Sequence, residues 1–574
     1  MGATGSLSCA CCASLMSDLN AILSAAFQAH QNNDIATAIR GYQTVLQQLP
    51  GNWQVRTLLA TAQLQSGDLA GAEAGFMASL QLNQGQADAW LNLGNVRRER
   101  GALQDALAAF DQCLALNADF PPAWVNRGNV LTALGRHADA ISSHQRALAL
   151  APDYADAHGN LAIAYWEQRD FAAALAAAEQ AIALDNADPA PWLTRGHALR
   201  GLSRYADSLQ SYEAALARNP SHAHAWQNKA NALCDLGRHA EALQSYAQAL
   251  QLTPDDADIQ WAIALTQLQL GQFAEGWANY EARWRLPSRA GDLARFAIPR
   301  WAGEPLQGKR IVLHTEQGFG DAIQFSRFAL TLLAQGAHVT LEVKAPLQTL
   351  LQSLSPAIQI VAQAGSSFAD HDYHCPLMSL PHVLGTTLAT LPAQTPYLHA
   401  SRARQAEWAA RLGAPSALRV GLVWSGSPTH KDDYSRSIPL AQLAGLVATP
   451  GTEFHSLHER VRDSDQAALA QLPITSHADR LSDFEATAAL ISQLDLVITV
   501  DTAVAHLAGA LGKPVWVLLP VSPDFRWLLD RSDNPWYPDA RLFRQRQAGD
   551  WPGVLAEAGA ALALLASQHA GTPA

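Results

Sequence analysis

The stretch AWVNRGNVLTALGRHADAISSHQRALALAP (123–152) decides the fold of the first half of the chain. It holds four landmarks, which are Trp124, Gly135, Ala140 and Pro152. Each landmark recurs along the chain in steps of 34 residues. A fixed period of this length indicates structural units that stack on one another to bury a continuous core.

The glycine position is the most regular of the four. A left-handed backbone costs least in a residue without a Cβ atom, so we expect the turn between the two helices of each repeat here. The members of this register are Gly67, Gly101, Gly135, Arg169, Ser203, Gly237 and Gly271.

The other registers also have physical roles. Small residues are expected where two helices approach closely, and they stand at Ala72, Ala106, Ala140, Ala174, Ser208, Ala242 and Gly276. We expect the aromatic register to fill the gap that the small residues leave, and it holds Trp90, Trp124, His158, Trp192, Trp226 and Gln260. Proline suits the opening of a repeat, where no helical N–H is lost, and it stands at Pro50, Pro152, Pro220 and Pro254.

These registers resemble the tetratricopeptide family over nearly half of the chain. The resemblance predicts an all-α solenoid of about seven to eight repeats over residues 18–285, with an atypical last repeat that ends in GWANYEARWRL (276–286). Its concave surface is expected to bind a protein. Residues 1–17 are predicted to be a disordered tail, and residues 286–308 a connector.

Composition narrows the class of protein. A net charge of -12 and a pI near 5.9 argue against nucleic acid as a partner. There is no apolar run near the length of a membrane span and no signal-peptide pattern at the N-terminus. The few cysteines indicate a reducing compartment, so we expect a cytoplasmic protein. Cys9, Cys11 and Cys12 lack further ligands at matching spacing, so an incidental cluster is favoured over a metal site.

After the repeats the pattern changes to alternating strands and helices. Strands are predicted at RIVLHT (310–315), HVTLEV (338–343) and IQIVA (358–362), with helices at 322–336 and 346–354 between them. This alternation indicates a parallel sheet with helices on both faces.

A second unit of the same kind follows. Its expected elements are a helix at 402–412, strands at 419–424, 452–457, 494–500 and 514–520, the last clear strand, and a terminal helix at 552–568. The C-terminal half is therefore predicted to be a pair of Rossmann-like lobes, 309–412 and 413–574, with a cleft between them.

The loop EQGFGD (316–321) follows the first strand of lobe one. Gln317, Gly318 and Gly320 would let the backbone approach a ligand, but the loop lacks the spacing of a dinucleotide fingerprint. Asp321 has two interpretations. It caps the following helix, or it is a general base that takes a proton from an acceptor hydroxyl.

The turn DTAVAH, which starts at Asp501, follows a strand of lobe two. It is expected to place the N–H groups of Thr502, Ala503 and Val504 at a helix N-terminus, where the partial positive charge favours a diphosphate. Asp501 would orient the turn rather than contact the anion. His506 either faces the donor or packs beneath the sheet, and packing is the commoner role of a single histidine.

The loop after strand 419–424 offers Ser425, Lys431 and Arg436 to anionic oxygens. Cations near a leaving diphosphate stabilise the charge that develops on it. The alternative is an ordinary solvated loop. Glu459, after strand 452–457, could accept hydrogen bonds from ribose hydroxyls. No set of residues has metal-ligand spacing, so chemistry without a metal is expected.

At these motifs residues 300–545 resemble the ADP-heptose:lipopolysaccharide heptosyltransferase family. The resemblance rests on EQGFGD, on WSGSP and RSIPL, and on DTAVAHLAGALGKPVWVLLP. It implies a GT-B fold and an inverting, metal-independent transfer from a nucleotide-activated sugar, with no further cofactor.

The resemblance also assigns roles to single residues. It makes Asp321 the base, Arg436 a contact of the donor phosphates, and Asp501, Thr502 and Ala503 the diphosphate turn. Ala503 stands where the family usually has glycine, so the approach of the backbone could differ there.

The repeats indicate which class of acceptor to expect. Repeat-bearing glycosyltransferases, such as the O-linked GlcNAc transferases and the flagellin glycosyltransferases, are similar in plan and modify proteins. We therefore expect a protein acceptor, for example flagellin or another surface protein, held by the repeats. Two alternatives stay open: a non-catalytic adaptor that keeps the GT-B fold, and a transferase that acts on a saccharide such as lipopolysaccharide.

Overall fold

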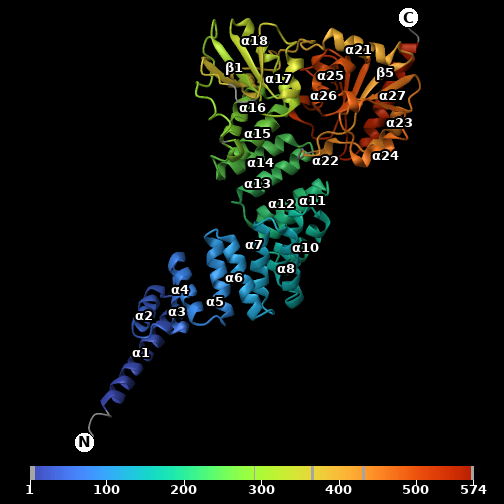
Figure 1. The fold of residues 1–574 in the computed structure, drawn as a ribbon. Helices are drawn as coiled ribbons and strands as arrows, with labels where there is room; N and C mark the ends of the chain where they lie inside the picture. The colour runs from blue at the N-terminus through green and yellow to red at the C-terminus, as the bar shows by residue number, and fades with distance from the viewer. Residues whose placement is uncertain (1–6, 290, 364–366, 430–432, 571–574) are drawn as a thin grey trace. The chain divides into compact units, whose positions relative to one another are not determined.

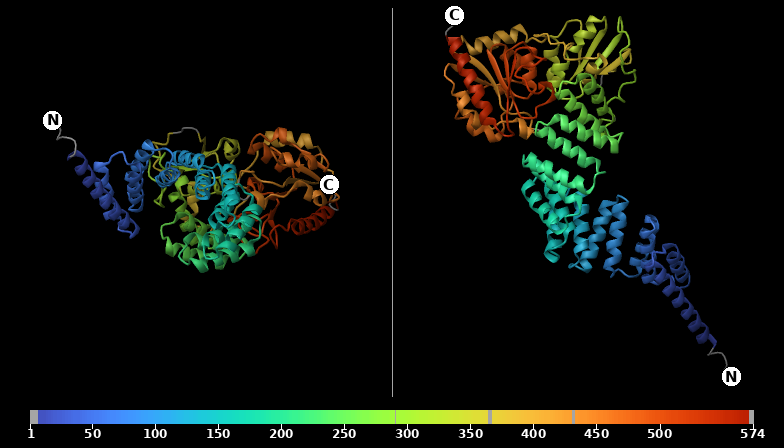
Figure 2. Two further views of the ribbon diagram at one scale, coloured as in Figure 1. Left: turned by 90° about the horizontal axis from the view of Figure 1, so that it is seen from below. Right: turned by 180° about the vertical axis from the view of Figure 1, so that it is seen from behind.

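The computed structural model describes residues 7–289, 291–363, 367–429 and 433–570. The chain divides into two compact units, Met1–Ser221 and His222–Ala574. The first unit is a stack of helices α1 to α12 (Figures 1 and 2). Their bounds are Leu7–Gln31, Ile35–Gln48, Trp53–Gln65, Leu69–Leu82, Ala87–Glu99, Leu103–Leu116, Pro121–Ala133, His137–Leu150, Ala155–Glu167, Phe171–Leu184, Pro189–Gly201 and Tyr205–Arg218.

The predicted turns of the repeats are confirmed. All seven positions of the glycine register have positive φ, including Arg169 at 64° and Ser203 at 59°. A side chain in this conformation costs about 1 kcal/mol, which the packing of the neighbouring helices offsets. Asn33, one period before Gly67, has φ 62° and marks a further turn of the same kind.

The small-residue register is buried as predicted, and the first helices of several repeats hold a further close approach at a glycine. A Cβ atom on Gly94 would lie 2.5 Å from the Phe110 ring. The same relation holds one and three periods later, where His144 packs on Gly128 and Tyr212 on Gly196. In these three repeats the space beside the glycine is therefore filled from the second helix, at the register that contains Phe110.

Several members of the tryptophan register also bond to the preceding loop. Trp90 Nε1 donates to Gln84 O at 3.0 Å, and Trp124 Nε1 donates to Ala118 O at 2.8 Å. His158 Nε2 lies 2.9 Å from Pro152 O in the same relation. Each bond reaches the carbonyl six residues earlier, which fixes the loop between consecutive repeats.

The disordered tail predicted for residues 1–17 is wrong from residue 7 onward, where helix α1 begins. Residues 1–6 lie outside the described residues. Alanine and leucine are strong helix formers, and α1 also has a packing partner, because a Cβ on Gly41 of α2 would lie 2.5 Å from Ala26. Cys9, Cys11 and Cys12 fall on the first turns of this helix.

The second unit begins with the last helices of the repeats and continues into lobe one. The helical part consists of α13 (Ala223–Asp235), α14 (His239–Leu252), α15 (Ala257–Gln269), α16 (Phe273–Tyr280), η1 (Glu281–Arg285) and η2 (Pro287–Arg289). Lobe one then forms a parallel sheet in the order β3-β2-β1-β4. Its elements are β1 (Arg310–His314), α17 (Phe319–Phe325), α18 (Phe328–Ala334), β2 (His338–Val343), α19 (Ala345–Leu351), β3 (Gln359–Ala362), β4 (Tyr373–Pro376), η3 (Leu377–Ser379) and α20 (Leu380–Val383).

Lobe two is a second parallel sheet, in the order β10-β9-β8-β5-β6-β7. Its strands are β5 (Leu418–Val423), β6 (Thr452–Ser456), β7 (Ile474–Ser476), β8 (Leu496–Val500), β9 (Val515–Leu519) and β10 (Ala540–Arg544). Its helices are α21 (Arg402–Leu412), α22 (Asp433–Arg436), η4 (Leu440–Leu443), α23 (Ala444–Val447), η5 (Asp463–Asp465), α24 (Gln466–Leu469), η6 (Ala478–Arg480), α25 (Phe484–Ser492), α26 (Ala503–Ala510), η7 (Phe525–Trp527) and α27 (Trp551–Ala570). The predicted class, a solenoid followed by two Rossmann-like lobes, is confirmed.

Some elements differ from the prediction. The single helix expected over 322–336 is split into α17 and α18, because the Ser326 hydroxyl bonds back to Ile323 O at 2.8 Å and Arg327 turns into the core. The short edge strands β4, β7 and β10 were not predicted, and β10 rather than β9 is the last strand. These strands are short and contain polar residues, so they lack a recognisable alternation of apolar and polar residues.

The predicted boundary between the lobes at 412/413 is also wrong, because α21 packs on lobe two. Ser401 N donates to Glu485 Oε1 at 2.9 Å, and Arg404 pairs with Glu485 at 2.8 Å. The Trp408 ring meets His477 edge-on at 5.0 Å. The chain therefore crosses to lobe two before residue 401.

One hydrophobic core joins the last repeat helices to both lobes. The Trp277 ring of α16 lies 5.8 Å from Phe325 of α17 and 5.6 Å from Phe525 of η7. Residue 285 is therefore not a domain boundary, since the division into compact units falls at 221/222. Tertiary contacts of this kind do not change the repeat period, so the sequence pattern does not reveal them.

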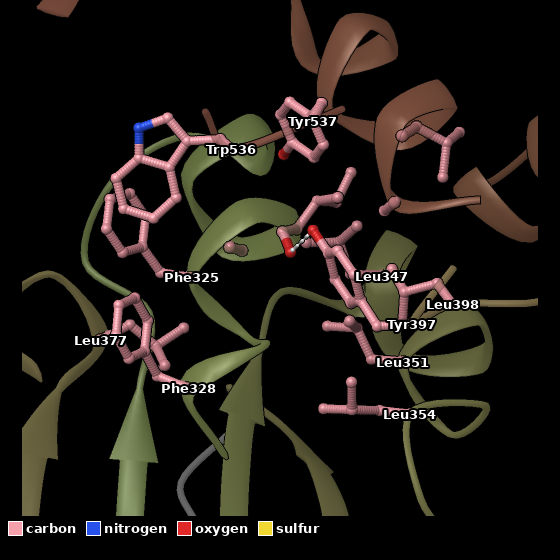
Figure 3. Packing of buried hydrophobic residues seen from close by; sticks show 14 of the residues in the cluster. Phe325, Phe328, Leu347, Leu351, Leu354, Leu377, Tyr397, Leu398, Trp536 and Tyr537 are labelled. Carbon is pink, nitrogen blue, oxygen red and sulfur yellow. Dashed lines mark hydrogen bonds between the residues drawn. The ribbon is translucent and has the colours of Figure 1, made fainter. Parts of the chain in front are cut away.

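Figure 3 shows the same core from within, with Trp536 of lobe two close to Phe325 of lobe one. The buried Arg327 guanidinium donates to Trp536 O at 2.8 Å and to Tyr397 OH at 2.9 Å. Tyr397 OH in turn donates to Ile323 O at 3.0 Å. A buried cation with all these acceptors fixes how the two lobes meet.

Candidate functional site

The EQGFGD loop of lobe one places Asp321 in the first turn of α17. Asp321 Oδ2 accepts a hydrogen bond from Gly318 N at 2.7 Å, so the carboxylate does cap its own helix. Asp321 Oδ1 pairs with the guanidinium of Arg526 from η7. Asp321 is thus both a capping group and one half of an ion pair that links the two lobes.

Gly320 has a role that differs from the predicted approach to a ligand. A Cβ atom there would lie 2.7 Å from His506 Cδ2 and 3.4 Å from Ala503 Cα. Gly318 has an ordinary φ of −73° and caps α17. The small residue at 320 therefore lets the start of α17 rest on the start of α26.

We expect Gly320→Ala to destabilise the protein by about 1–3 kcal/mol, because the His506 ring cannot move away. That ring stacks on Trp527 at 5.3 Å and its Nδ1 lies 3.1 Å from Tyr537 OH. The unfolding midpoint in urea measures the effect. Gly445→Ala is the control, since nothing lies within 4 Å of its added Cβ. Equal midpoints for the two variants would contradict this account.

His506 itself is buried, and burial lowers its pKa well below the ordinary value. Its neighbours are Gly320, Trp527 and Tyr537. These contacts are those of a packed side chain, and a donor-binding role of His506 stays a prediction. The side chain of Gln317 is also held by the protein, because its Nε2 donates a hydrogen bond to Tyr280 OH at 2.6 Å.

The turn after β8 begins helix α26. Thr502 Oγ1 accepts from Val504 N at 3.3 Å, so one of the predicted N–H groups is already capped. Thr502, Ala503 and Val504 are all half-buried and keep part of their surface open at the helix start. Burial, followed by the nearby carboxylate of Asp524, raises the pKa of Asp501 to about 6.

Arg436 lies beside this turn. Its Nη1 donates to Asp501 O at 3.0 Å, and a Cβ on Gly426 would lie 2.6 Å from its Nη2. Arg436 Nε is buried without a hydrogen-bond partner in the described part of the chain. Arg436 Nε also lies 3.9 Å from Asp433 Oδ1. The guanidinium therefore lies beside the start of α26, a position that suits contact with a phosphate oxygen.

A second layer of polar groups holds this loop in place. Arg462 Nη2 donates to Gly426 O at 2.7 Å and pairs with Asp433 at 2.6 Å. Asp433 Oδ1 also accepts from Ser437 Oγ at 2.8 Å. These groups position the loop that carries Ser425 and Arg436.

The other residues that were predicted to bind the sugar donor do not all lie near this loop. Ser425 is buried at the end of β5, close to this loop. Lys431 lies outside the described residues. Glu459 is exposed after β6 and forms no hydrogen bond or ion pair within the described ranges. The structure thus brings together Asp321, Arg436 and the start of α26, and leaves Glu459 apart.

Arg526 and Asp524 also belong to this site and were not predicted from the sequence. Arg526 is almost fully buried, pairs with Asp524 at 2.7 Å and with Asp321, and these carboxylates hold its pKa above the ordinary value. The segment PDFRW (523–527) follows β9, and a charge at the carboxyl end of a parallel strand was the available signal.

The charges around the start of α26 indicate what this site could bind. Arg436 lies beside the start of α26, and a helix N-terminus with a nearby cation is a favourable place for an anion such as a diphosphate. A carboxylate from the opposite lobe, Asp321, lies at the same junction. Anion binding and proton acceptance can therefore occur close together.

Comparison with known proteins agrees with this division of the chain. Tetratricopeptide-repeat models match residues 29–93, 89–121, 119–187, 193–257 and 228–282. The model of glycosyltransferase family 9 (heptosyltransferase) matches residues 463–544, which contain α26 and Arg526. No helix among the described residues has the length and apolar character that crossing a bilayer requires.

One curated relative is protein FlbA of Caulobacter vibrioides, which is 27% identical over 312 residues. The match covers 50% of this chain and 52% of FlbA, so the chain spans about half the length of that relative.

Among solved structures, the TPR protein YrrB is 22% identical, with a TM-score of 0.28 over 33% of this chain and 96% of YrrB. TTC0263 of Thermus thermophilus is 24% identical, with a TM-score of 0.29 over 32% of this chain and all of its own. Nothing about function follows from similarities of this size. The chain therefore joins tetratricopeptide repeats to a C-terminal α/β region that carries the glycosyltransferase family 9 match.

Proposed function

We propose that the protein transfers a sugar from a nucleotide-activated donor to a protein acceptor that its repeats bind. The observation that supports this best is the junction of Asp321 with the start of α26, beside Arg436. It combines an anion site on one lobe with a carboxylate from the other.

The reaction would be a direct displacement without a metal. An acceptor hydroxyl attacks the anomeric carbon of the sugar while the bond to the nucleotide diphosphate breaks. Asp321 takes the hydroxyl proton, and Arg436 with the N–H groups of α26 stabilises the charge on the leaving diphosphate. The configuration at the anomeric carbon is inverted in such a single step.

Protein acceptors are favoured over the alternatives by the repeats, which bind proteins in many settings. A surface protein such as flagellin is the acceptor class we propose, and the cytoplasm is the proposed compartment. A non-catalytic adaptor is less favoured because a cation, Arg436, lies beside the start of α26, where its Nη1 donates to Asp501 O. A saccharide acceptor is the remaining alternative.

Intact mass spectrometry of proteins that co-purify with the enzyme tests this proposal. We expect acceptors that carry one or more added sugar masses with the wild type. Asp321→Asn should keep the acceptors bound but abolish the added mass, since an amide cannot take the proton. Asp372→Asn is the matched control, because this exposed carboxylate of the same lobe pairs with Lys309.

The possible outcomes separate the hypotheses. Unchanged added mass with Asp321→Asn would remove this residue as the base. Bound proteins without added mass in the wild type would favour the adaptor. Added mass found on a glycan and on no protein would favour the saccharide-directed transferase.

A further inference from the structure

The second helices of the repeats share an aromatic register that continues into the last repeat. Its ring-bearing members, at multiples of 34 residues, are Tyr42, Phe76, Phe110, His144, Tyr212, Tyr246 and Tyr280. In two repeats the tyrosine hydroxyl of this register bonds to the first helix of its own repeat. Tyr246 OH donates to Asn231 Oδ1 at 2.6 Å, and Tyr42 OH lies 3.1 Å from His30 Nδ1. The register therefore serves to hold the two helices of a repeat together.

The last repeat uses the same position for a different contact. Tyr280 of α16 is 1% exposed, and its hydroxyl accepts a hydrogen bond from Gln317 Nε2 at 2.6 Å. Gln317 belongs to the loop EQGFGD (316–321), which also carries Asp321. A hydroxyl that holds a helix pair together elsewhere in the solenoid therefore holds the loop of the proposed base.

A charged side chain from the same end of the repeats holds the neighbouring loop residue. Arg283 of η1 is fully buried and donates to Glu316 Oε1 from Nη2 at 2.8 Å and from Nε at 3.2 Å. Its other N–H groups donate to Tyr280 O at 3.1 Å and to Ser379 Oγ at 2.8 Å. The guanidinium also lies 4.6 Å from the centre of the Tyr280 ring. Tyr280 and Arg283 thus form one packed unit against residues 316 and 317.

Lobe one itself holds this loop through backbone atoms. Lys344 Nζ donates to Gln317 O at 2.6 Å, and Gln363 Nε2 donates to Thr315 O at 2.7 Å. In contrast, the side chains of residues 316 and 317 bond to the end of the repeats. The loop therefore has two sets of anchors, and one of them comes from outside the lobe.

The position of this loop decides where the carboxylate of Asp321 lies. Asp321 Oδ2 accepts from Gly318 N at 2.7 Å, so the side chain is tied to the backbone directly after Gln317. A general base has to lie within hydrogen-bond reach of the proton that it takes. A displacement of about 1 Å in a reacting group can slow a reaction about 100-fold.

We propose that Tyr280 and Arg283 are positioning residues, which hold Gln317 and Glu316 so that Asp321 lies where it can take a proton from the acceptor hydroxyl. The role of Asp321 rests on the proposed function, whereas the contacts between the last repeat and the loop do not. Sugar transfer should therefore depend on this repeat even in a protein whose acceptor is bound.

Hydrogen–deuterium exchange of the full-length protein tests the hold on the loop directly. Tyr280→Phe keeps the buried ring and removes only the hydroxyl, so the protein should stay folded. We expect the amides of residues 316–321 to exchange about fivefold faster than in the wild type, because the loop loses one of its side-chain anchors. Tyr246→Phe is the matched control, since it removes a buried hydroxyl with an equally short bond of 2.6 Å one repeat earlier. It should leave the exchange of this loop unchanged.

Intact mass spectrometry of co-purified acceptors measures the effect on transfer. Early after induction, Tyr280→Phe should lower the fraction of acceptor that carries added sugar about tenfold, while the acceptor still co-purifies. Gln317→Leu removes the other partner of the same bond and should act similarly. The double variant should be no slower than the slower single variant, because both changes break one contact. Tyr246→Phe should add sugar as the wild type does.

The outcomes separate this proposal from the proposed function. Wild-type exchange of the loop in Tyr280→Phe, or equal effects of Tyr280→Phe and Tyr246→Phe, would overturn the positioning role. Multiplied effects in the double variant would also overturn it. A wild type that adds sugar to no protein would count against the proposed function instead, and the exchange measurement would still decide whether the last repeat holds the loop.

Discussion

A chain that begins at residue 222 should fold cooperatively, whereas a chain that begins at residue 286 should not. The shorter chain lacks α16 and η1, and with them Trp277 and Arg283, which are both buried in the core of the α/β lobes. The effect is expected to be the largest of any change considered, because it removes part of a core rather than a separate domain.

The free energies lost with these residues indicate that the 286–574 chain will not fold. Truncating a buried tryptophan to alanine costs about 3–5 kcal/mol. Removing Arg283 leaves Glu316 as a buried carboxylate without its partner, which costs about 3–5 kcal/mol more. Since whole domains are stable by about 5–15 kcal/mol, these two losses consume a large part of the total.

Thermal unfolding followed by circular dichroism measures this difference, with the 222–574 chain as the matched control. The control should show one steep transition, and the 286–574 chain should show a broad change or none. A steep transition in the 286–574 chain would show that the repeats end at an independent domain boundary after all. Experiments that remove the repeats should therefore cut at 221/222.

Replacing Arg526 by leucine should destabilise the protein by about 3–5 kcal/mol, the second largest effect we expect. The guanidinium is almost buried between the carboxylates of Asp321 and Asp524. Without it these two acids lie near one another with no cation between them. Urea unfolding of the full-length protein measures the loss.

Arg531→Leu is the matched control for Arg526→Leu. Arg531 follows in the same segment and pairs with Asp533 at 2.6 Å, but the two side chains are 32% and 67% exposed. An exposed pair of this kind contributes about 0–1 kcal/mol. Similar losses for the two variants would contradict the structural role of the Arg526 pair.

A double variant gives an independent check. Adding Asp321→Asn to Arg526→Leu should restore part of the lost stability, because it removes one of the two unpaired charges. Strict additivity of the two changes would mean that Asp321 and Arg526 do not interact in solution.

Much of the repeat fold could be predicted because its signals are local and periodic. The turn positions follow from the conformational freedom of glycine, and the buried small residues follow from close helix approach. The packing of Phe110 on Gly94 and the bond from Trp124 to the preceding loop were not predicted, although both aromatic positions were visible in the sequence. Only three-dimensional contacts distinguish a gap filler from a residue that ties a loop.

The candidate site was predictable where it lies on motifs next to strands. Asp321, Arg436 and the turn at Asp501 each follow a buried strand, and the structure brings all three to one junction. Arg526 could not be assigned in this way because its partner Asp321 is 205 residues away in sequence.

The classes of structure in this protein follow from its sequence: a helical repeat with a period of 34 residues, followed by two parallel α/β lobes. The domain boundaries and the ion pairs between distant residues follow only from the folded structure. Periodicity reports how each helix or strand buries one face, which is a local property of the chain. The packing of Trp277 between two lobes and the ion pair of Asp321 with Arg526 depend on contacts between distant segments, which no local pattern records.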